Sequence, residues 1–320
     1  MKTKPIVAIC YDFDGTLSPG NMQEYGFFPG LSQKDQKSFW EQSAKLAKEN
    51  GANRILAYMQ LMLKKAEESK NKQNKTDPPL MTTPKAIREY GKNIKLFPGV
   101  ETWFKRIREH GKKRGLQVEH YIVSSGLTEM IEGSPIGKEF ERIYACSFMY
   151  DHNDVAEWPA QVVDCTSKTQ YLFRISKGAH DLSDTKALNM PVKEENRHVP
   201  FSRMIYIGDG TTDVPSMTLV QSRGGHSIAV YQPKSKLKRQ EALDLVKDGR
   251  VQFCFPADYS EGEKLEEAIK RILDFIQASW KLEQLRPRIP ETHPGDNRKS
   301  ACHLSPVAQI QMTDKGLSTP

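Results

Sequence analysis

One short segment near the N-terminus constrains the fold more than any other feature of the sequence. Ile6–Tyr11 is an unbroken run of apolar and β-prone residues that ends abruptly in Asp-Phe-Asp-Gly-Thr at positions 12–16. A strand that is apolar on both faces must be covered on both faces, as inner strands of parallel sheets are. We therefore expect a sheet with helices on both sides and an acidic loop where its first strand ends.

Three later apolar runs have the same form. Residues 118–123 lead into Ser-Ser-Gly, residues 204–207 lead into Gly-Asp-Gly-Thr-Thr-Asp, and residues 227–231 follow a Gly-Gly pair. Helical patterns separate these runs, at residues 100–114, 127–140 and 213–221. Strands that alternate with helices predict right-handed crossovers and an open, doubly wound α/β sheet. Ligands of such sheets bind outside the carboxyl ends of the strands.

The segment after the first strand does not fit the sheet. Residues 32–48 and 52–69 have the spacing of two amphipathic helices. We interpret residues 21–95 as a helical cap, inserted where it can cover the strand ends. Five large apolar residues of the cap are interpreted as helix-packing residues rather than substrate contacts: Phe39, Trp40, Tyr58, Met59 and Met62.

Three further segments complete the predicted organisation. Residues 1–20 and 96–285 form the α/β core. Polar residues between β-prone flanks predict a hairpin over residues 148–163. Its acidic turn at 151–154 is interpreted as solvated rather than as a second metal site, because neighbouring strand residues alternate faces. Residues 286–320 are rich in Pro, Lys, Gln, Ser and Thr and are predicted to be disordered.

The composition argues against several classes of protein. The chain has no run of 18 apolar residues, so no membrane span is expected. Its net charge is +7, but no aromatic residues are interleaved with the densest basic runs, so a nucleic-acid groove is not expected. A positive field would also attract small phosphorylated molecules. Five scattered cysteines without a C-x-x-C pair fit a reducing cytoplasm, and the oligomeric state stays open.

Asp12 and Asp14 are placed for chemistry on an anion. A carboxylate is a poor nucleophile toward a phosphate, because both are negative, so its attack needs a cation. Asp12 could attack, while Asp14 could protonate the leaving oxygen and later deprotonate water. Magnesium prefers oxygen ligands. We expect its ligands and their supports to come from four residues: Asp12, Asp14, Asp209 and Asp213.

Four segments together resemble the ordered motifs of the haloacid dehalogenase-like hydrolase superfamily. They are Asp-Phe-Asp-Gly-Thr at 12–16, Ser-Ser-Gly at 124–126, Lys-Gly at 177–178 and Gly-Asp-Gly-Thr-Thr-Asp at 208–213. The surroundings of the second and third motifs, and the hairpin, are similar to the phosphoserine phosphatase-like branch. Thr212 stands where that branch commonly has Asn, so the resemblance does not identify the substrate.

The resemblance implies hydrolysis of a phosphate monoester in two steps. Asp12 would become an aspartyl-phosphate, and Asp14 would be the acid and base. Asp209 and Asp213 would hold Mg2+. The implied substrate is a small phosphorylated molecule.

The resemblance also implies a phosphate-binding loop and a neutralising lysine. Ser124 would hydrogen-bond the phosphoryl oxygens, with Ser125 and Gly126 in the same loop. Lys177 would neutralise these oxygens, and it is preferred to Lys168 because Gly178 is adjacent to it.

Two other functions stay open at this point. A phosphotransferase or phosphomutase would pass the phosphoryl group from Asp12 to an acceptor other than water. A binding or regulatory module would keep the fold without turnover, although a complete set of acidic, Ser and Lys residues argues against it.

Overall fold

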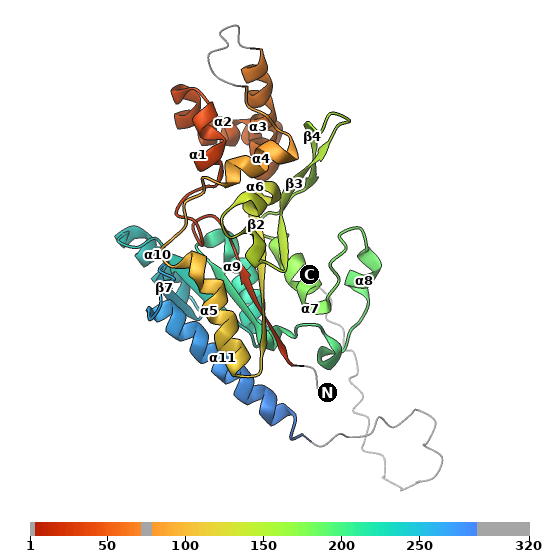
Figure 1. Ribbon diagram of the computed structural model, residues 1–320, viewed down its shortest axis with the longest axis vertical. Helices are drawn as coiled ribbons and strands as arrows, with labels where there is room; N and C mark the ends of the chain where they lie inside the picture. The colour runs from red at the N-terminus through yellow and green to blue at the C-terminus, as the bar shows by residue number, and fades with distance from the viewer. Residues whose placement is uncertain (1–3, 72–78, 287–320) are drawn as a thin grey trace, which may run out of the picture. The chain divides into compact units, whose positions relative to one another are not determined.

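The computed structural model describes residues 4–71 and 79–286, and a seven-stranded sheet is its centre (Figure 1). The strands are β1 (Ile6–Tyr11), β2 (Gln117–Leu127), β3 (Arg142–Tyr150), β4 (Ala156–Gln161), β5 (Met204–Gly208), β6 (His226–Tyr231) and β7 (Phe253–Pro256). Their order is β4-β3-β2-β1-β5-β6-β7, and every neighbouring pair is parallel except β3 and β4. The chain therefore winds outward from β1 in both directions, which confirms the predicted doubly wound α/β fold.

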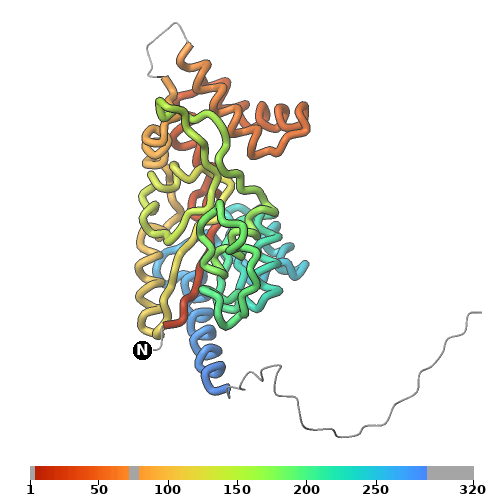
Figure 2. The backbone as a smooth tube through the Cα atoms, turned by 90° about the vertical axis from the view of Figure 1, so that its right-hand side faces the viewer, coloured from red at the N-terminus to blue at the C-terminus, as the bar shows by residue number. Residues whose placement is uncertain are grey.

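Helices cover the sheet. The larger core helices are α5 (Val100–Lys113), α7 (Lys168–Lys177), α9 (Val214–Ser222), α10 (Lys236–Lys247) and α11 (Lys264–Glu283). Helices α5 and α11 lie side by side, and Arg114, which directly follows α5, forms an ion pair with Asp274 of α11 (N to O 2.7 Å) (Figures 1 and 2). The core beneath them is apolar, and β1 is fully buried from Val7 to Tyr11. None of the helices among the described residues has the length and apolar character needed to cross a bilayer.

Helices also fill the segment predicted to be a cap. They are α1 (Gln23–Gly26), α2 (Gln33–Asn50), α3 (Arg54–Lys70) and α4 (Pro84–Gly91), with a 3-10 turn at Phe28–Gly30. The side chain of Ser32 caps α2 by accepting from the Asp35 amide, and Asn53 caps α3 by accepting from the Ile55 amide. The two predicted helices are confirmed. The predicted disordered tail lies outside the described residues beyond Arg286.

The predicted helix over residues 127–140 is too long, and only its first part is α-helical. Strand β2 continues to Leu127, and only α6 (Thr128–Gly133) and a 3-10 turn at Gly137–Glu139 follow it. Pro135 explains the short helix, because a residue before proline avoids the helical region, and Ser134 is extended (ψ 159°). Strand β7 was not predicted.

Strands β3 and β4 form the predicted hairpin. Its turn is closed by the Asp151 carboxylate, which accepts from the backbone amides of Asn153 (2.9 Å) and Val155 (2.8 Å). Asp151 is thus a turn-forming residue. Beside the turn, the Ala156 amide donates to the Thr82 carbonyl (3.1 Å), which joins the hairpin by a backbone hydrogen bond to the segment predicted to be a cap.

A buried histidine in β2 makes the stability of the fold dependent on pH. His120 is 1% exposed; Trp103 donates to the Tyr11 hydroxyl (2.9 Å), which in turn lies 3.0 Å from His120 Nδ1. Burial lowers the pKa of His120 to about 3, and the charge of Arg108 acts in the same direction. The folded state therefore keeps the ring neutral at pH values where the unfolded chain, with a pKa near 6.5, takes up a proton.

The neutral His120 should lower the free energy of unfolding as the pH falls from about 6.5 toward 3. The loss should reach up to about 1.4 kcal/mol for each pH unit. We expect the free energy of unfolding to fall about 2 kcal/mol less between pH 7.5 and 5 in His120→Asn than in the wild type. Asn still offers Tyr11 an acceptor but does not titrate. Urea denaturation at both pH values measures the difference, and equal losses in the two proteins would contradict the prediction.

Candidate active site

Three aspartates meet at the carboxyl edge of β1 and β5. Tyr11 pairs with Ile207 in the parallel ladder, so the residues that follow the two strands lie next to each other. The Asp12 amide extends the ladder by donating to the Ile207 carbonyl (3.0 Å). Asp12, Asp209 and Asp213 each offer a carboxylate oxygen, and these oxygens lie within 4.8 Å of one another. The two acidic motifs, almost 200 positions apart in the sequence, thus form one cluster.

Gly15 allows the two acidic loops to approach. Its φ is +76°, a conformation that favours glycine, and a Cβ there would lie 2.2 Å from Asp209 Oδ2. A side chain at position 15 would therefore occupy the space of the Asp209 carboxylate.

The lysine at the aspartates is Lys168, and the prediction of Lys177 is wrong. Lys168 is completely buried, and its Nζ lies 3.0 Å from Asp12 Oδ2 and 2.8 Å from Asp213 Oδ1. Lys177 donates instead to the carbonyls of Leu188 (2.6 Å) and Met190 (2.7 Å).

The position of each lysine along α7 explains the difference. Lys168 is the first residue of the helix and Lys177 the last, so about 13 Å of helix axis separate them. Gly178, which favoured Lys177 in the sequence, is the left-handed residue that ends α7 (φ 70°). The glycine belongs to a helix terminus rather than to a phosphate site.

Asp213 orients the other members of the cluster. It is completely buried; Oδ1 accepts from Lys168 and from the Tyr206 hydroxyl (2.6 Å), and Oδ2 from the Asp209 amide (3.3 Å). Tyr206 was missed in the sequence, because an aromatic residue inside an apolar strand looks like any core residue.

Asp14 lies beside this cluster rather than in it. Its Oδ1 accepts from the Met22 amide (3.0 Å), and its carboxylate does not belong to the group of three. The prediction that the Asp14 carboxylate joins the metal ligands is therefore not met. Burial raises the pKa of Asp14 well above its ordinary value, and the charge of Asp12 raises it further. A carboxyl group that keeps its proton can act as an acid.

The charges of the cluster favour a divalent cation. Burial raises the pKa of Asp12 to about 6, although Lys168 opposes the rise. Burial, with the charges of Asp213 and Asp12, raises the pKa of Asp209 to about 8. Burial alone would lower the pKa of Lys168, but Asp12 and Asp213 outweigh it and raise the pKa. When all three carboxyl groups are ionised, the ammonium group leaves two negative charges unbalanced, and a bound divalent cation would favour this ionised state.

The spacing of the oxygens also fits Mg2+. Magnesium binds oxygens at about 2.1 Å in octahedral geometry, so two of its ligands lie about 3 or 4.2 Å apart. The oxygens of Asp12 and Asp209, within 4.8 Å of each other, are compatible with that spacing after small side-chain movements. Both oxygens of Asp213 already accept hydrogen bonds, so Asp213 fits a supporting role.

The Ser-Ser-Gly loop, an irregular part of β2 at residues 124–126, lies next to the acidic loops. Strand β2 runs beside β1, with Tyr11 opposite Ile122, and the register with β3 breaks between Val123 and Leu127. Ser124 is 1% exposed, and its Oγ accepts from the Gly126 amide (3.1 Å). Its hydroxyl hydrogen therefore stays available to an oxygen of a ligand.

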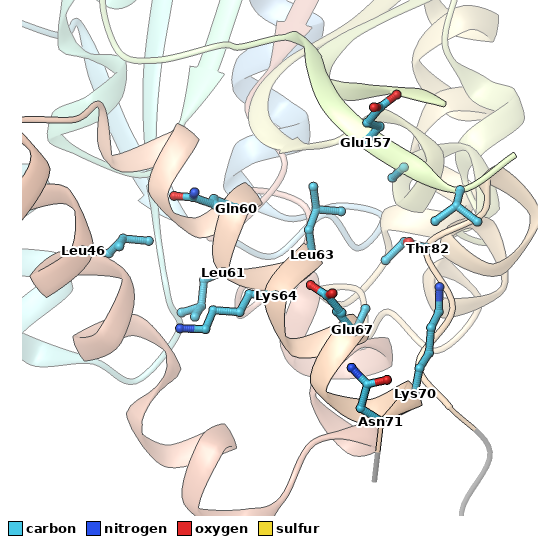
Figure 3. A pocket seen from close by; sticks show the side chains of 13 residues that line it. Leu46, Gln60, Leu61, Leu63, Lys64, Glu67, Lys70, Asn71, Thr82 and Glu157 are labelled. Carbon is cyan, nitrogen blue, oxygen red and sulfur yellow. The ribbon is translucent and has the colours of Figure 1, made fainter. Parts of the chain in front are cut away.

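A pocket of about 860 Å3 lies elsewhere, between α3 and the hairpin (Figure 3). It is lined by residues that include Leu63, Glu67, Thr82 and Glu157, and by none of the site aspartates. The cluster of aspartates with Lys168, rather than this pocket, is therefore the candidate active site.

The fold and the site define a doubly wound α/β protein with an acidic, lysine-bearing site beside the first strand of its sheet. The chain belongs to the same family as an uncharacterized protein of Borreliella burgdorferi strain B31. The two are 30% identical over 288 residues, which cover 81% of this chain and 94% of that protein. No family model matches the sequence.

Solved structures with similarity to this chain include phosphatases and related hydrolases. One is a substrate-bound phosphoserine phosphatase (15% identity, 84% of this chain and 99% of that chain, TM-score 0.48). Another is a HAD-family hydrolase of Salmonella enterica serovar Typhi (14% identity, 80% and 72%, TM-score 0.48). A third is cytosolic 5'-nucleotidase IIIB bound to cytidine (11% identity, 88% and 88%, TM-score 0.46).

Proposed function

We propose that the protein is a Mg2+-dependent phosphatase that hydrolyses a small phosphate monoester through an aspartyl-phosphate on Asp12. The observation that carries the proposal is the position of Asp12 at the end of β1. It lies against the buried ammonium of Lys168 and within 4.8 Å of the carboxylate oxygens of Asp209 and Asp213. A buried carboxylate with this much compensating charge nearby is suited to approach an anionic phosphate.

In the first step, an oxygen of Asp12 attacks phosphorus and the bond to the ester oxygen breaks. The leaving alkoxide takes the proton of Asp14, whose raised pKa keeps that proton on the carboxyl group. Lys168 offers positive charge to the phosphoryl group that is transferred, and Ser124 offers it a hydroxyl donor. Mg2+ held by Asp12 and Asp209 would supply further positive charge to the phosphoryl oxygens.

In the second step, water attacks the phosphorus of the aspartyl-phosphate. Asp14, now ionised, takes a proton from this water. Inorganic phosphate leaves and the Asp12 carboxylate is restored. Asp213 acts through Lys168 in both steps, because it fixes the ammonium group between two carboxylates.

The proposal predicts that activity depends on Mg2+. Release of inorganic phosphate from a panel of phosphate monoesters should fall at least about 100-fold when a chelator replaces Mg2+. Mg2+ at 100 times its Kd should also stabilise the fold by about 2.7 kcal/mol, which a thermal melt would detect. Asp209→Asn should lose most of both effects.

Two outcomes would count against the proposal. Unchanged phosphate release in chelator would exclude the role of the cation. Phosphorylated product that forms only with an added acceptor, without free phosphate, would assign the chain to phosphotransferases instead.

A further inference from the structure

Tyr58 of the cap reaches the Ser-Ser-Gly loop of the core. It lies in α3, is 4% exposed, and its hydroxyl donates to the Ser125 carbonyl (2.8 Å). The Cys146 thiol donates more weakly to the same oxygen (3.4 Å). The sequence indicated only a packing role for Tyr58, yet its hydroxyl makes a bond to the loop that carries Ser124.

This bond fixes one peptide group. The Ser125 carbonyl and the Gly126 amide belong to the same planar unit and point in opposite directions. The carbonyl accepts from Tyr58, while the amide donates to Ser124 Oγ (3.1 Å). Rotation of this peptide plane would break both bonds together. The orientation of the Ser124 hydroxyl is thus linked to the Tyr58 hydroxyl through a single rigid unit.

The peptide lies at an irregular part of β2, where the register with β3 shifts between Val123 and Leu127. A second residue of the cap segment contacts the same loop: Met22 Sδ lies 3.1 Å from the Leu127 amide. A Cβ on Gly126 would lie 2.0 Å from Met22 Cε, so the methionine packs directly on the glycine.

We infer that Tyr58 is a positioning residue of the active site, through which the cap sets the orientation of the Ser124 hydroxyl toward the phosphoryl group. The inference rests on the proposed phosphatase function. The inference goes beyond that function because it places a determinant of phosphate binding on the cap, outside the four motifs. Chains of hydrogen bonds polarise one another, so the bond from Tyr58 should also strengthen donation by Ser124.

Tyr58→Phe tests the inference, because it removes one hydroxyl and keeps the ring that packs in the cap. With para-nitrophenyl phosphate and Mg2+, kcat/KM should fall about 10- to 30-fold, as expected for one oriented hydrogen bond. The inhibition constant of inorganic phosphate should rise by a similar factor. Calorimetry of phosphate binding gives the same readout without turnover.

Tyr90→Phe is the matched control. The Tyr90 hydroxyl also donates to a backbone carbonyl, that of Met81 (3.0 Å), but within the cap and away from the loop. Its removal should change kcat/KM and phosphate affinity less than twofold. Thermal melts should show similar small losses of stability for both variants. A difference in activity would then reflect the position of the hydroxyl rather than a general loss of stability.

The two proposals fail in different ways. If the wild type hydrolyses the ester and both variants behave alike, Tyr58 has no positioning role and the proposed function stands. If the wild type neither hydrolyses esters nor binds phosphate with Mg2+, the proposed function fails and the inference fails with it. Loss of phosphate affinity in Tyr58→Phe alone supports the inference.

Discussion

Asp12→Asn is expected to abolish turnover, by about 10^4-fold or more, while the chain stays folded. The amide is not a nucleophile, so no phosphoryl-enzyme can form. Its oxygen can still accept from the Phe13 amide, as Asp12 Oδ1 does at 2.7 Å. Phosphate release in the presence of Mg2+ measures the loss, and circular dichroism with a thermal melt measures the fold.

Asp181→Asn provides a matched control. Asp181 is exposed, and its carboxylate accepts from the amide and the hydroxyl of the neighbouring Ser183. The same change of charge there should leave activity within about twofold, as surface substitutions usually do. Retention of most Mg2+-dependent activity by Asp12→Asn would refute the assignment of the nucleophile. Acid-quenched wild-type enzyme should carry a labelled phosphoryl group that the variant lacks.

Lys168→Gln should have the second largest effect, on both activity and stability. The ammonium group lies between Asp12 and Asp213, and its loss leaves two buried carboxylates without their cation. Breaking a buried ion pair costs about 3 kcal/mol. We expect phosphate release to fall about 10^2- to 10^3-fold, because charge on the transferring group is no longer neutralised.

Lys177→Gln separates the two lysines. Its ammonium group donates to the carbonyls of Leu188 and Met190, so the expected loss is about 1 kcal/mol or less of stability, with activity within twofold. Urea denaturation and initial rates, both with Mg2+, compare the variants. A large loss of activity in Lys177→Gln, with Lys168→Gln still active, would support Lys177 as the neutralising lysine instead.

Much of the fold was predictable, because apolar periodicity reports burial directly. The run at Ile6–Tyr11 and its acidic ending placed β1 and its loop correctly, and the helical spacing after it found α2 and α3. The predicted helix over residues 127–140 ends early, at Gly133, because the effect of Pro135 on the residue before it was missed.

The candidate site was predictable where sheet geometry decides it. Asp12 and Asp209 follow strands that pair in parallel, so their meeting follows from topology. The lysine does not follow a strand. Its place depends on which end of α7 faces the site, and nothing in the sequence states that direction. Tyr206 was missed and Tyr58 was assigned only a packing role, because their rings satisfy the apolar pattern while their hydroxyls make the hydrogen bonds that orient other groups.

The backbone hydrogen bond between Ala156 and Thr82 joins the hairpin to the helical segment that follows β1. These two segments lie far apart in the sequence, because one follows the first strand and the other is formed by β3 and β4. An insertion or deletion beside either residue would break this bond. The aspartates would keep their places, because they follow β1 and β5 of the sheet.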